Sequence, residues 1–186
     1  MKAQLCLVLF VVFTFLSCSS TKPKLSAEEQ QKNVQLINSA LATKSFQFNA
    51  EFAYPLQSND VIMATNALMR GSQNIGGQIN LSGNYDFLKV DGETAEGDLS
   101  YFGEMRNVGY NDIADNSIIF SGDYTDFNID EKSKSDKFII QFDTNNQVET
   151  FRIRMVVFDN LKSNIIVYGS NRTAIRYTGT FEPLMD

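Results

Sequence analysis

The sequence predicts a mainly β protein: an antiparallel up-and-down barrel or strongly curled sheet of about ten strands, with one N-terminal helix. From Phe46 to Tyr54 and in later segments, apolar and polar residues alternate with a period of two, which is typical of strands with one buried face. Turns rich in Gly, Asn and Asp separate these segments, and strands joined by tight turns are antiparallel neighbours. A long meander curls to bury its apolar face, and closure removes exposed edges. A two-sheet sandwich is the alternative.

The predicted helix spans residues 27–43. Ser26 and Glu29 have the S-x-x-E spacing of a capping box, which satisfies free N–H groups at a helix start. Apolar residues recur from Val34 at i, i+3 and i+7, so one face can dock on a core while the other stays in water.

The predicted strands follow the helix, and turns such as Asp91-Gly92 separate them. They cover 46–54, 78–82, 85–90, 94–101, 117–121, 124–131, 137–142, 148–158, 164–168 and 174–181. We expect residues 58–77 to form an irregular excursion. The side chains predicted to point inward are Phe48, Phe52, Phe138, Ile140, Phe151, Ile153, Ile175 and Tyr177.

The N-terminus has the pattern of a bacterial lipoprotein signal. Lys2 precedes an apolar run, Leu5–Leu16, that is too short for a bilayer span of about 20 residues. Ser17-Cys18 at its end resembles a lipobox, in which cleavage falls before a cysteine that then carries acyl chains, palmitate among them. An ordinary cleaved signal is the alternative.

This pattern divides the chain into a signal peptide (1–17), a lipidated tether (18–25) and a single β-rich domain with its helix (26–186). The lipid on Cys18 would be the membrane anchor. Ser19, rather than Asp, follows that cysteine, which by analogy with enteric sorting favours the outer membrane, facing the periplasm.

The composition excludes several kinds of chemistry. The chain has 186 residues and no His, so Ser-His and Cys-His catalysis and His-ligated metals are excluded. With 16 basic and 22 acidic residues its net charge is −6, which argues against binding to nucleic acid. We expect no cofactor, no metal and no catalytic residue, and we favour a non-catalytic protein over an enzyme.

Acidic residues allow two alternatives. Asp126, Asn128 and Asp130 share one face of a predicted strand, where a solvated face is favoured over a Ca²⁺ site; a loop at 111–116 could wrap an ion more easily. A carboxylate-dependent hydrolase would need two acids facing one cleft. The acids available for it are Glu93, Glu96, Asp98 and Glu104.

Two motifs are candidates for a site. Tyr101, Phe102 and Tyr110 flank a Gly-containing loop, and aromatic loops at a barrel mouth commonly bind ligands. Asn171-Arg172 precedes the last strand, where Arg172 could bind an anion or lock the turn. Five predicted strands separate the motifs, which places them at opposite ends of a simple meander. We therefore expect the aromatic loop to be the ligand end and Asn171-Arg172 to be a structural turn.

Short motifs in the second half also resemble a known family. Leu99-Ser100-Tyr101-Phe102-Gly103 is followed by an Ile-Ile-Phe strand at Ile118 and, near the C-terminus, by Ser170-Asn171-Arg172. With the signal and helix in front, the chain resembles domain-of-unknown-function family 4251 over about residues 28–181. The resemblance implies a β-rich, envelope-anchored lipoprotein domain and implies no activity.

The function expected from these observations is a lipid-anchored periplasmic protein that binds a small molecule or an envelope protein. A structural envelope factor is a further alternative. Whether the barrel interior is filled or hollow distinguishes a protein-binding role from a ligand-carrying one.

Overall fold

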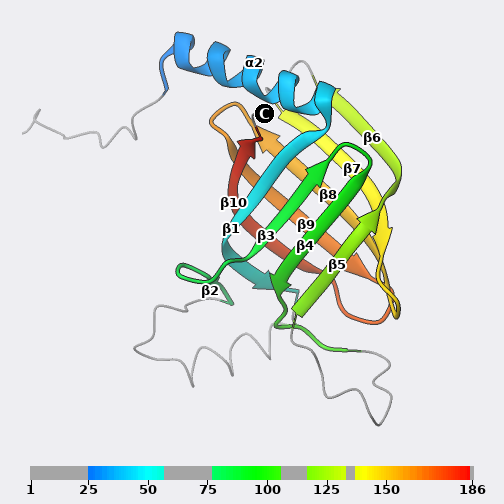
Figure 1. Cartoon of the computed structure of the whole chain (residues 1–186). Coiled ribbons are helices and arrows are strands. Elements are labelled where there is room, and N and C mark those ends of the chain that lie inside the picture. Colours follow the sequence, from blue (N-terminus) through cyan, green and yellow to red (C-terminus); the bar gives the residue numbers. More distant parts are fainter. Residues whose placement is uncertain (1–24, 57–76, 106–116, 133–136, 185–186) are drawn as a thin grey trace, which may run out of the picture.

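The computed structural model describes residues 25–56, 77–105, 117–132 and 137–184, which form one helix and ten antiparallel strands in a nearly closed, barrel-like sheet (Figure 1). The mainly β prediction is confirmed. The elements are α2 (Ala27–Thr43), β1 (Ser45–Pro55), β2 (Ile79–Asn80), β3 (Phe87–Asp91), β4 (Thr94–Ser100), β5 (Ser117–Asp123), β6 (Thr125–Lys132), β7 (Lys137–Asn145), β8 (Thr150–Phe158), β9 (Lys162–Gly169) and β10 (Ile175–Pro183). The predicted signal peptide and most of the tether lie outside the described residues.

The sheet follows one continuous path, β5-β4-β3-β1-β10-β9-β8-β7-β6, with β2 pairing on β1 beside it. Each neighbouring pair on this path is antiparallel. Because nine strands alternate in direction, the first, β5, and the last, β6, run the same way. Only Tyr124 separates them in the chain, and Figure 1 shows β6 continuing upward from β5. They are not a hairpin, although the predicted strands 117–121 and 124–131 are separated only by Gly122-Asp123, a sequence typical of a tight turn.

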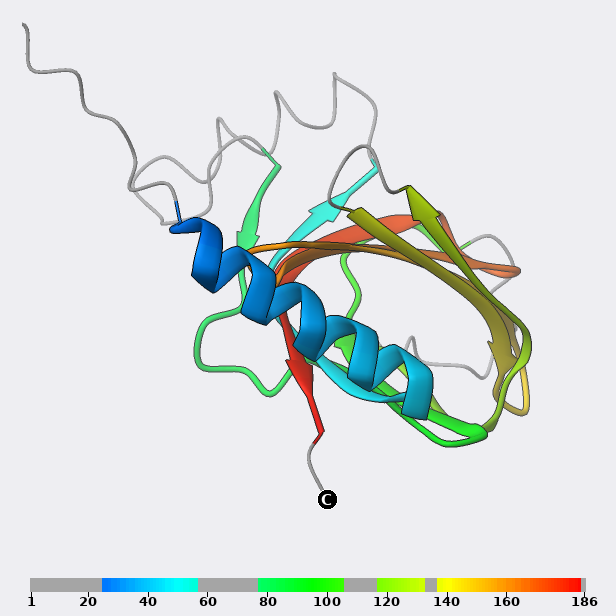
Figure 2. The same cartoon turned by 90° about the horizontal axis from the view of Figure 1, so that it is seen from above.

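Helix α2 lies across one end of the curled sheet (Figure 2) and packs against β1 and β10. Its capping box forms as predicted: the Ser26 hydroxyl accepts from the Glu29 N–H at 3.2 Å, and Glu29 accepts from the Ser26 N–H at 3.0 Å. Lys44, in the left-handed conformation, ends the helix and turns the chain into β1. No helix among the described residues has the length and apolarity needed to cross a membrane.

Alternating side chains fill the sheet's concave interior. The fully buried set includes the rings of Phe46, Phe120 and Tyr177, and the Phe120 and Phe151 rings pack 5.6 Å apart. Seven of the eight inward predictions are confirmed. These are Phe48, Phe138, Ile140, Phe151, Ile153, Ile175 and Tyr177. Among the described residues, the inward face of the sheet is therefore packed with large apolar side chains.

The exception is Phe52, which is only half-buried. A β-bulge between Ala50 and Phe52 inserts one residue against β10, so the inward phase passes to Ala53. Gly179 of β10 allows the backbone of Asn49 to approach so closely that no Cβ would fit there. The sequence alternation gave no sign of this shift because aromatic residues occupy both faces.

Candidate functional site

The structure brings the two sequence-predicted motifs together. The Arg172 Cζ atom lies 4.7 Å from the centroid of the Tyr101 ring, and Arg172 forms an isolated antiparallel bridge with Met105. The prediction that these motifs occupy opposite ends of the barrel is therefore wrong. The prediction counted Gly122-Asp123 as a point where the chain reverses its direction. Because β5 and β6 run in the same direction, there is one reversal fewer, and both motifs lie at the same end of the barrel. Tyr110 lies outside the described residues.

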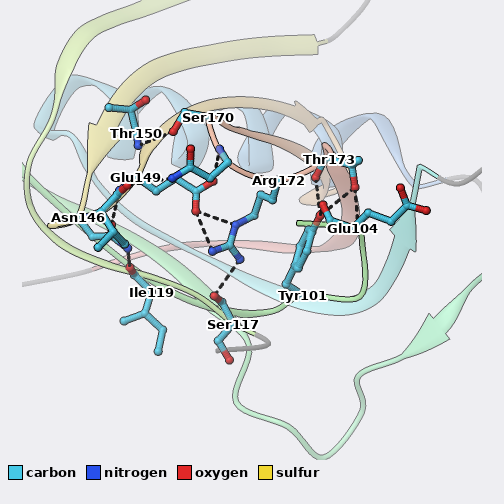
Figure 3. A network of polar contacts seen from close by, with 12 residues as sticks. Tyr101, Glu104, Ser117, Ile119, Asn146, Glu149, Thr150, Ser170, Arg172 and Thr173 are labelled. Carbon is cyan, nitrogen blue, oxygen red and sulfur yellow. Dashed lines mark hydrogen bonds and ion pairs between the residues drawn. The ribbon is translucent and has the colours of Figure 1, made fainter. Parts of the chain in front are cut away.

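A buried ion pair forms the centre of this region (Figure 3). Arg172 Nε and Nη2 both lie 2.8 Å from Glu149 Oε2, with the side chains 6% and 1% exposed. Glu149 Oε1 accepts the backbone N–H of Asn171 at 3.0 Å. Because Glu149 precedes β8 and Arg172 follows β9, the pair links the β7–β8 and β9–β10 turns.

The surroundings of Arg172 satisfy the rest of its guanidinium. Its Nη1 donates to the Ser117 carbonyl at 3.0 Å, and its Cζ lies 5.7 Å from the Phe151 ring centroid. The planar group is thus placed near two aromatic rings, where cation–π attraction adds to the ion pair. Gly169 makes room for it: a Cβ there would collide with the Glu149 carboxylate and the Arg172 Cγ.

Tyr101 is a buried anchor for the loop that follows β4. Its hydroxyl lies 2.8 Å from Thr173 Oγ1, and it contacts the Glu104 carbonyl at 2.8 Å and the Thr173 carbonyl at 3.0 Å. The Tyr101 side chain is 3% exposed, whereas its neighbour Phe102 is 38% exposed. In the predicted ligand loop, Tyr101 therefore points inward and connects the residues after β4 to Thr173, whereas Phe102 is partly exposed to solvent.

A second polar group lies on the same inner surface. Tyr177 donates to the Ser100 carbonyl at 2.9 Å, and Asp86 Oδ1 accepts the Ser100 N–H. Asp86 Oδ2 is buried with no hydrogen-bond partner in the described structure. Burial raises the pKa of the Tyr177 hydroxyl well above 10, and the Asp86 carboxylate raises it further, with Arg172 acting in the opposite direction.

Asn146 is an organising residue that sequence reasoning did not single out. Its Oδ1 accepts the N–H groups of Val148 at 3.0 Å and Glu149 at 2.8 Å, and its Nδ2 donates to the Ile119 carbonyl at 2.9 Å. It therefore shapes the β7–β8 turn and joins that turn to β5 (Figure 3).

Glu149 was also missed, although the sequence carried a signal. It continues the inward phase of β8 one residue before the strand begins, two residues before Phe151, and a carboxylate on an apolar phase needs a buried partner. The alternation that predicted the core could therefore have indicated Glu149 as half of an ion pair. Nothing in the local sequence identified Arg172 as the other half.

The chemistry available to this cluster is limited, because its charged and hydroxyl groups, apart from Asp86 Oδ2, already bind other groups of the protein. The four acids considered for hydrolysis, Glu93, Glu96, Asp98 and Glu104, are exposed rather than gathered in a cleft. Asp126, Asn128 and Asp130 are likewise exposed on β6, as predicted for a solvated face. No group of three or more His, Cys, Asp or Glu that could hold a metal occurs in the described residues. The predicted 111–116 loop lies outside them.

A groove of about 380 Å³ opens at the opposite end, between α2, the β3–β4 turn and the end of β10. Its lining is made of small and aliphatic residues, with Asp91 as its charged group. It offers no convergent set of buried polar groups of the kind that fixes a small molecule.

Comparison with known proteins identifies the fold and no activity. The family model described as "Domain of unknown function (DUF4251)" matches residues 28–181. A crystal structure of a DUF4251 family protein from Bacteroides eggerthii DSM 20697 at 1.95 Å resolution resembles this chain with a TM-score of 0.57 at 12% identity. The match covers 83% of this chain and 91% of that one. No curated protein matches the chain.

Proposed function

Because the chain belongs to the DUF4251 family, whose description assigns no activity, we propose its function from geometry: a lipid-anchored, non-catalytic periplasmic protein that docks an envelope partner. The docking surface is the barrel end opposite α2, called here the distal rim. The packed interior and the internally satisfied Arg172–Glu149 pair support a surface-binding role over a ligand-carrying or hydrolytic one.

The distribution of exposed apolar side chains carries this proposal. Strand β1 starts next to the end of α2 and therefore ends at the distal rim. Because directions alternate along the sheet, the strands antiparallel to β1 start at this rim and those parallel to β1 end there. The large exposed hydrophobic residues of the described chain lie at or near that rim: they follow β1 and β4, precede β3, lie in the first half of β5, occupy the β7–β8 turn and end β9. They are Leu56, Tyr85, Phe102, Ile119, Val148 and Tyr168. Exposed apolar side chains gathered at one place mark interaction sites.

The proposed anchor would be joined to the other side of the domain, where α2 begins. The tether from Cys18 joins α2 at Ser26, and eight residues reach about 28 Å when extended. This attachment point supports an orientation in which the helix-covered end faces the lipid and the distal rim faces the periplasm.

Site-specific crosslinking in cells tests this orientation and role. A photo-crosslinking phenylalanine analogue at Val148, which is 71% exposed, should give a discrete protein adduct. The same analogue at Gln31 on the exposed side of α2 should give none. Adding Tyr85→Ser and Phe102→Ser should abolish the Val148 adduct without lowering the melting temperature.

The anchor is tested separately with Cys18→Ser, which should release the protein from the membrane fraction. A Val148 adduct with lipid alone would show that the distal rim contacts the bilayer and would refute a protein partner. Retention of Cys18→Ser in membranes would refute the lipid anchor.

A further inference from the structure

A row of side chains crosses the outer face of the sheet just below the distal rim. Arg154 of β8 faces Ile166 of β9, which in turn faces Arg176 of β10. The residues before and after each of the three are buried, so all three side chains point outward. These three residues are called here the arginine row. Tyr168, a residue of the distal rim, lies two positions after Ile166 in β9, so the row adjoins the rim.

The two arginines of the row have no acidic partner. In the part of the chain that the structure describes, the side chains of Arg154 and Arg176 form no ion pair. The acid in the next row, Asp143, already binds Arg152 through both of its oxygens, at 2.9 and 2.8 Å. The Arg176 Cζ atom lies 4.5 Å from the centroid of the Tyr54 ring, a cation–π contact that positions the guanidinium without using its N–H donors. Two positive charges therefore remain uncompensated at one place in a chain whose net charge is −6.

Resting on the proposed docking function of the distal rim, we propose that the arginine row binds an acidic, amphipathic helix of the envelope partner. Two carboxylates of the helix would pair with Arg154 and Arg176, because a guanidinium binds a carboxylate through two parallel hydrogen bonds. An apolar side chain between them would cover Ile166. Complementary charge of this kind selects the partner and orients it on the neighbouring rim.

The spacing of the row favours a helix over an extended segment. Arg154 and Arg176 lie on strands separated by β9, so their backbones are about 10 Å apart. Helix positions i and i+7 are also about 10 Å apart and share one face, whereas side chains on one face of a strand repeat at about 7 Å.

The curvature of the sheet suits the same arrangement. The outer face is convex around the barrel (Figure 2), so a helix that crosses the strands comes closest to the middle one, β9. The short Ile166 side chain lies at that point of closest approach. On either side, where the sheet curves away, the long arginine side chains can reach the flanks of the helix.

Two other occupants fit less well. Helix α2 of a second copy has two acids, Glu28 and Glu29, which are adjacent in the first turn, and Glu29 already accepts the Ser26 N–H. It therefore lacks carboxylates seven positions apart. A membrane is also disfavoured, because in the proposed orientation the arginine row lies near the rim that faces the periplasm.

Photo-crosslinking in cells tests the row separately from the rim. The phenylalanine analogue at Ile166, in the full chain, should give an adduct with the same protein that the analogue at Val148 captures. Mass spectrometry of the Ile166 adduct should identify a partner segment with acidic residues seven positions apart. The same analogue at Ser121, exposed on the outer face of β5, should give no adduct.

Charge variants test the role of the arginines. Arg154→Glu with Arg176→Glu should lower the yield of both adducts at least about tenfold, because like charges then face each other. Lys32→Glu with Lys137→Glu makes the same change in net charge away from the row and should leave both yields unchanged. Arg154→Gln with Arg176→Gln should give an intermediate loss, and this pair keeps the proposal testable if the Glu pair unfolds.

The outcomes separate this inference from the proposed function. A Val148 adduct that persists in the Glu pair, or that forms without an Ile166 adduct, would overturn the arginine row and leave rim docking intact. An Ile166 adduct without a Val148 adduct would support the row and refute the rim. No adduct at either position would refute both.

The identity of the Ile166 adduct decides the chemistry. Crosslinking to a second copy of this chain would overturn a separate partner. Crosslinking to lipid or lipopolysaccharide alone would show that the arginines hold phosphate groups and would also overturn the proposal. A captured protein segment without paired acids would overturn the acidic helix.

Discussion

Arg172 and Glu149 connect the β9–β10 turn to the β7–β8 turn through two 2.8 Å contacts to a single carboxylate oxygen. Arg172→Ala should lower the free energy of unfolding by about 3–5 kcal/mol, because it leaves a buried carboxylate without its cation. Denaturant unfolding measures the loss.

The matched control replaces both partners. Arg172→Met with Glu149→Leu removes both buried charges and should cost less than Arg172→Ala alone. If Arg172→Ala were neutral for stability and instead abolished binding of an anionic ligand, the structural-turn assignment would be wrong.

Asn146 provides a graded test of how β5 is held. Asn146→Asp keeps the acceptor for the N–H groups of Val148 and Glu149 but loses the donor to Ile119, whereas Asn146→Ala loses both. We expect a loss of about 1–3 kcal/mol for the alanine variant, from unpaired backbone groups. Hydrogen exchange in 117–123 should accelerate in both variants, and unchanged exchange in Asn146→Asp would show that the Ile119 contact contributes nothing.

The Tyr177 hydroxyl should make the free energy of unfolding fall as pH rises in the alkaline range. Its pKa is raised in the folded protein, so its contribution is complete below the unfolded pKa near 10 and falls as pH rises above that value. The slope is about 1.4 kcal/mol per pH unit while the folded hydroxyl stays protonated. Urea unfolding between pH 9 and 11 should show a shallower decline for Tyr177→Phe than for the wild type; identical slopes would contradict this assignment.

Phe151 tests the inward phase of the sheet. The side chain is 1% exposed and lies near the Phe120 ring and Arg172, so Phe151→Ala should cost about 3–5 kcal/mol. Tyr168→Ala, on an exposed aromatic of the adjacent strand, should cost less than about 1 kcal/mol. An unchanged denaturant midpoint for Phe151→Ala would contradict its placement in the core.

The steric role of Gly169 can be measured by coupling. Gly169→Ala places a methyl group against the Glu149 carboxylate and the Arg172 Cγ and should destabilise the fold, whereas in a Glu149→Ala background only the part of that cost due to the carboxylate should disappear. Additive effects of the two substitutions would mean that the carboxylate is not what excludes a Cβ.

The parts of the fold that could be predicted are those determined by residues close together in the sequence. The Ser26–Glu29 capping box and the alternation around Ile140 and Ile153 each follow from residues a few positions apart, and the structure confirms them. The fold class followed because such strands have few ways to bury one apolar face.

The candidate site depended on information that the local sequence does not contain. Gly122-Asp123 is a good turn sequence, yet hydrogen bonding places β5 and β6 at opposite edges of the sheet. Because of this long-range arrangement, Arg172 lies against the ring of Tyr101 and not at the opposite end of the barrel, where it was predicted. The Phe52 error had a similar origin, since the bulge is set by pairing with β10.

The pairing of β1 with β10 also determines when folding can be completed. Phe46 pairs with Pro183, so the first strand of the domain lies between β3 and the last strand of the chain. During synthesis, a chain that has reached β9 still lacks the strand that joins its two halves, and its apolar faces remain accessible until β10 emerges. Such sequence-distant pairing slows folding and lengthens exposure to aggregation. We therefore expect the barrel to assemble only once β10 is available, and a truncation that removes β10 should leave two separate meanders rather than a slightly weakened barrel.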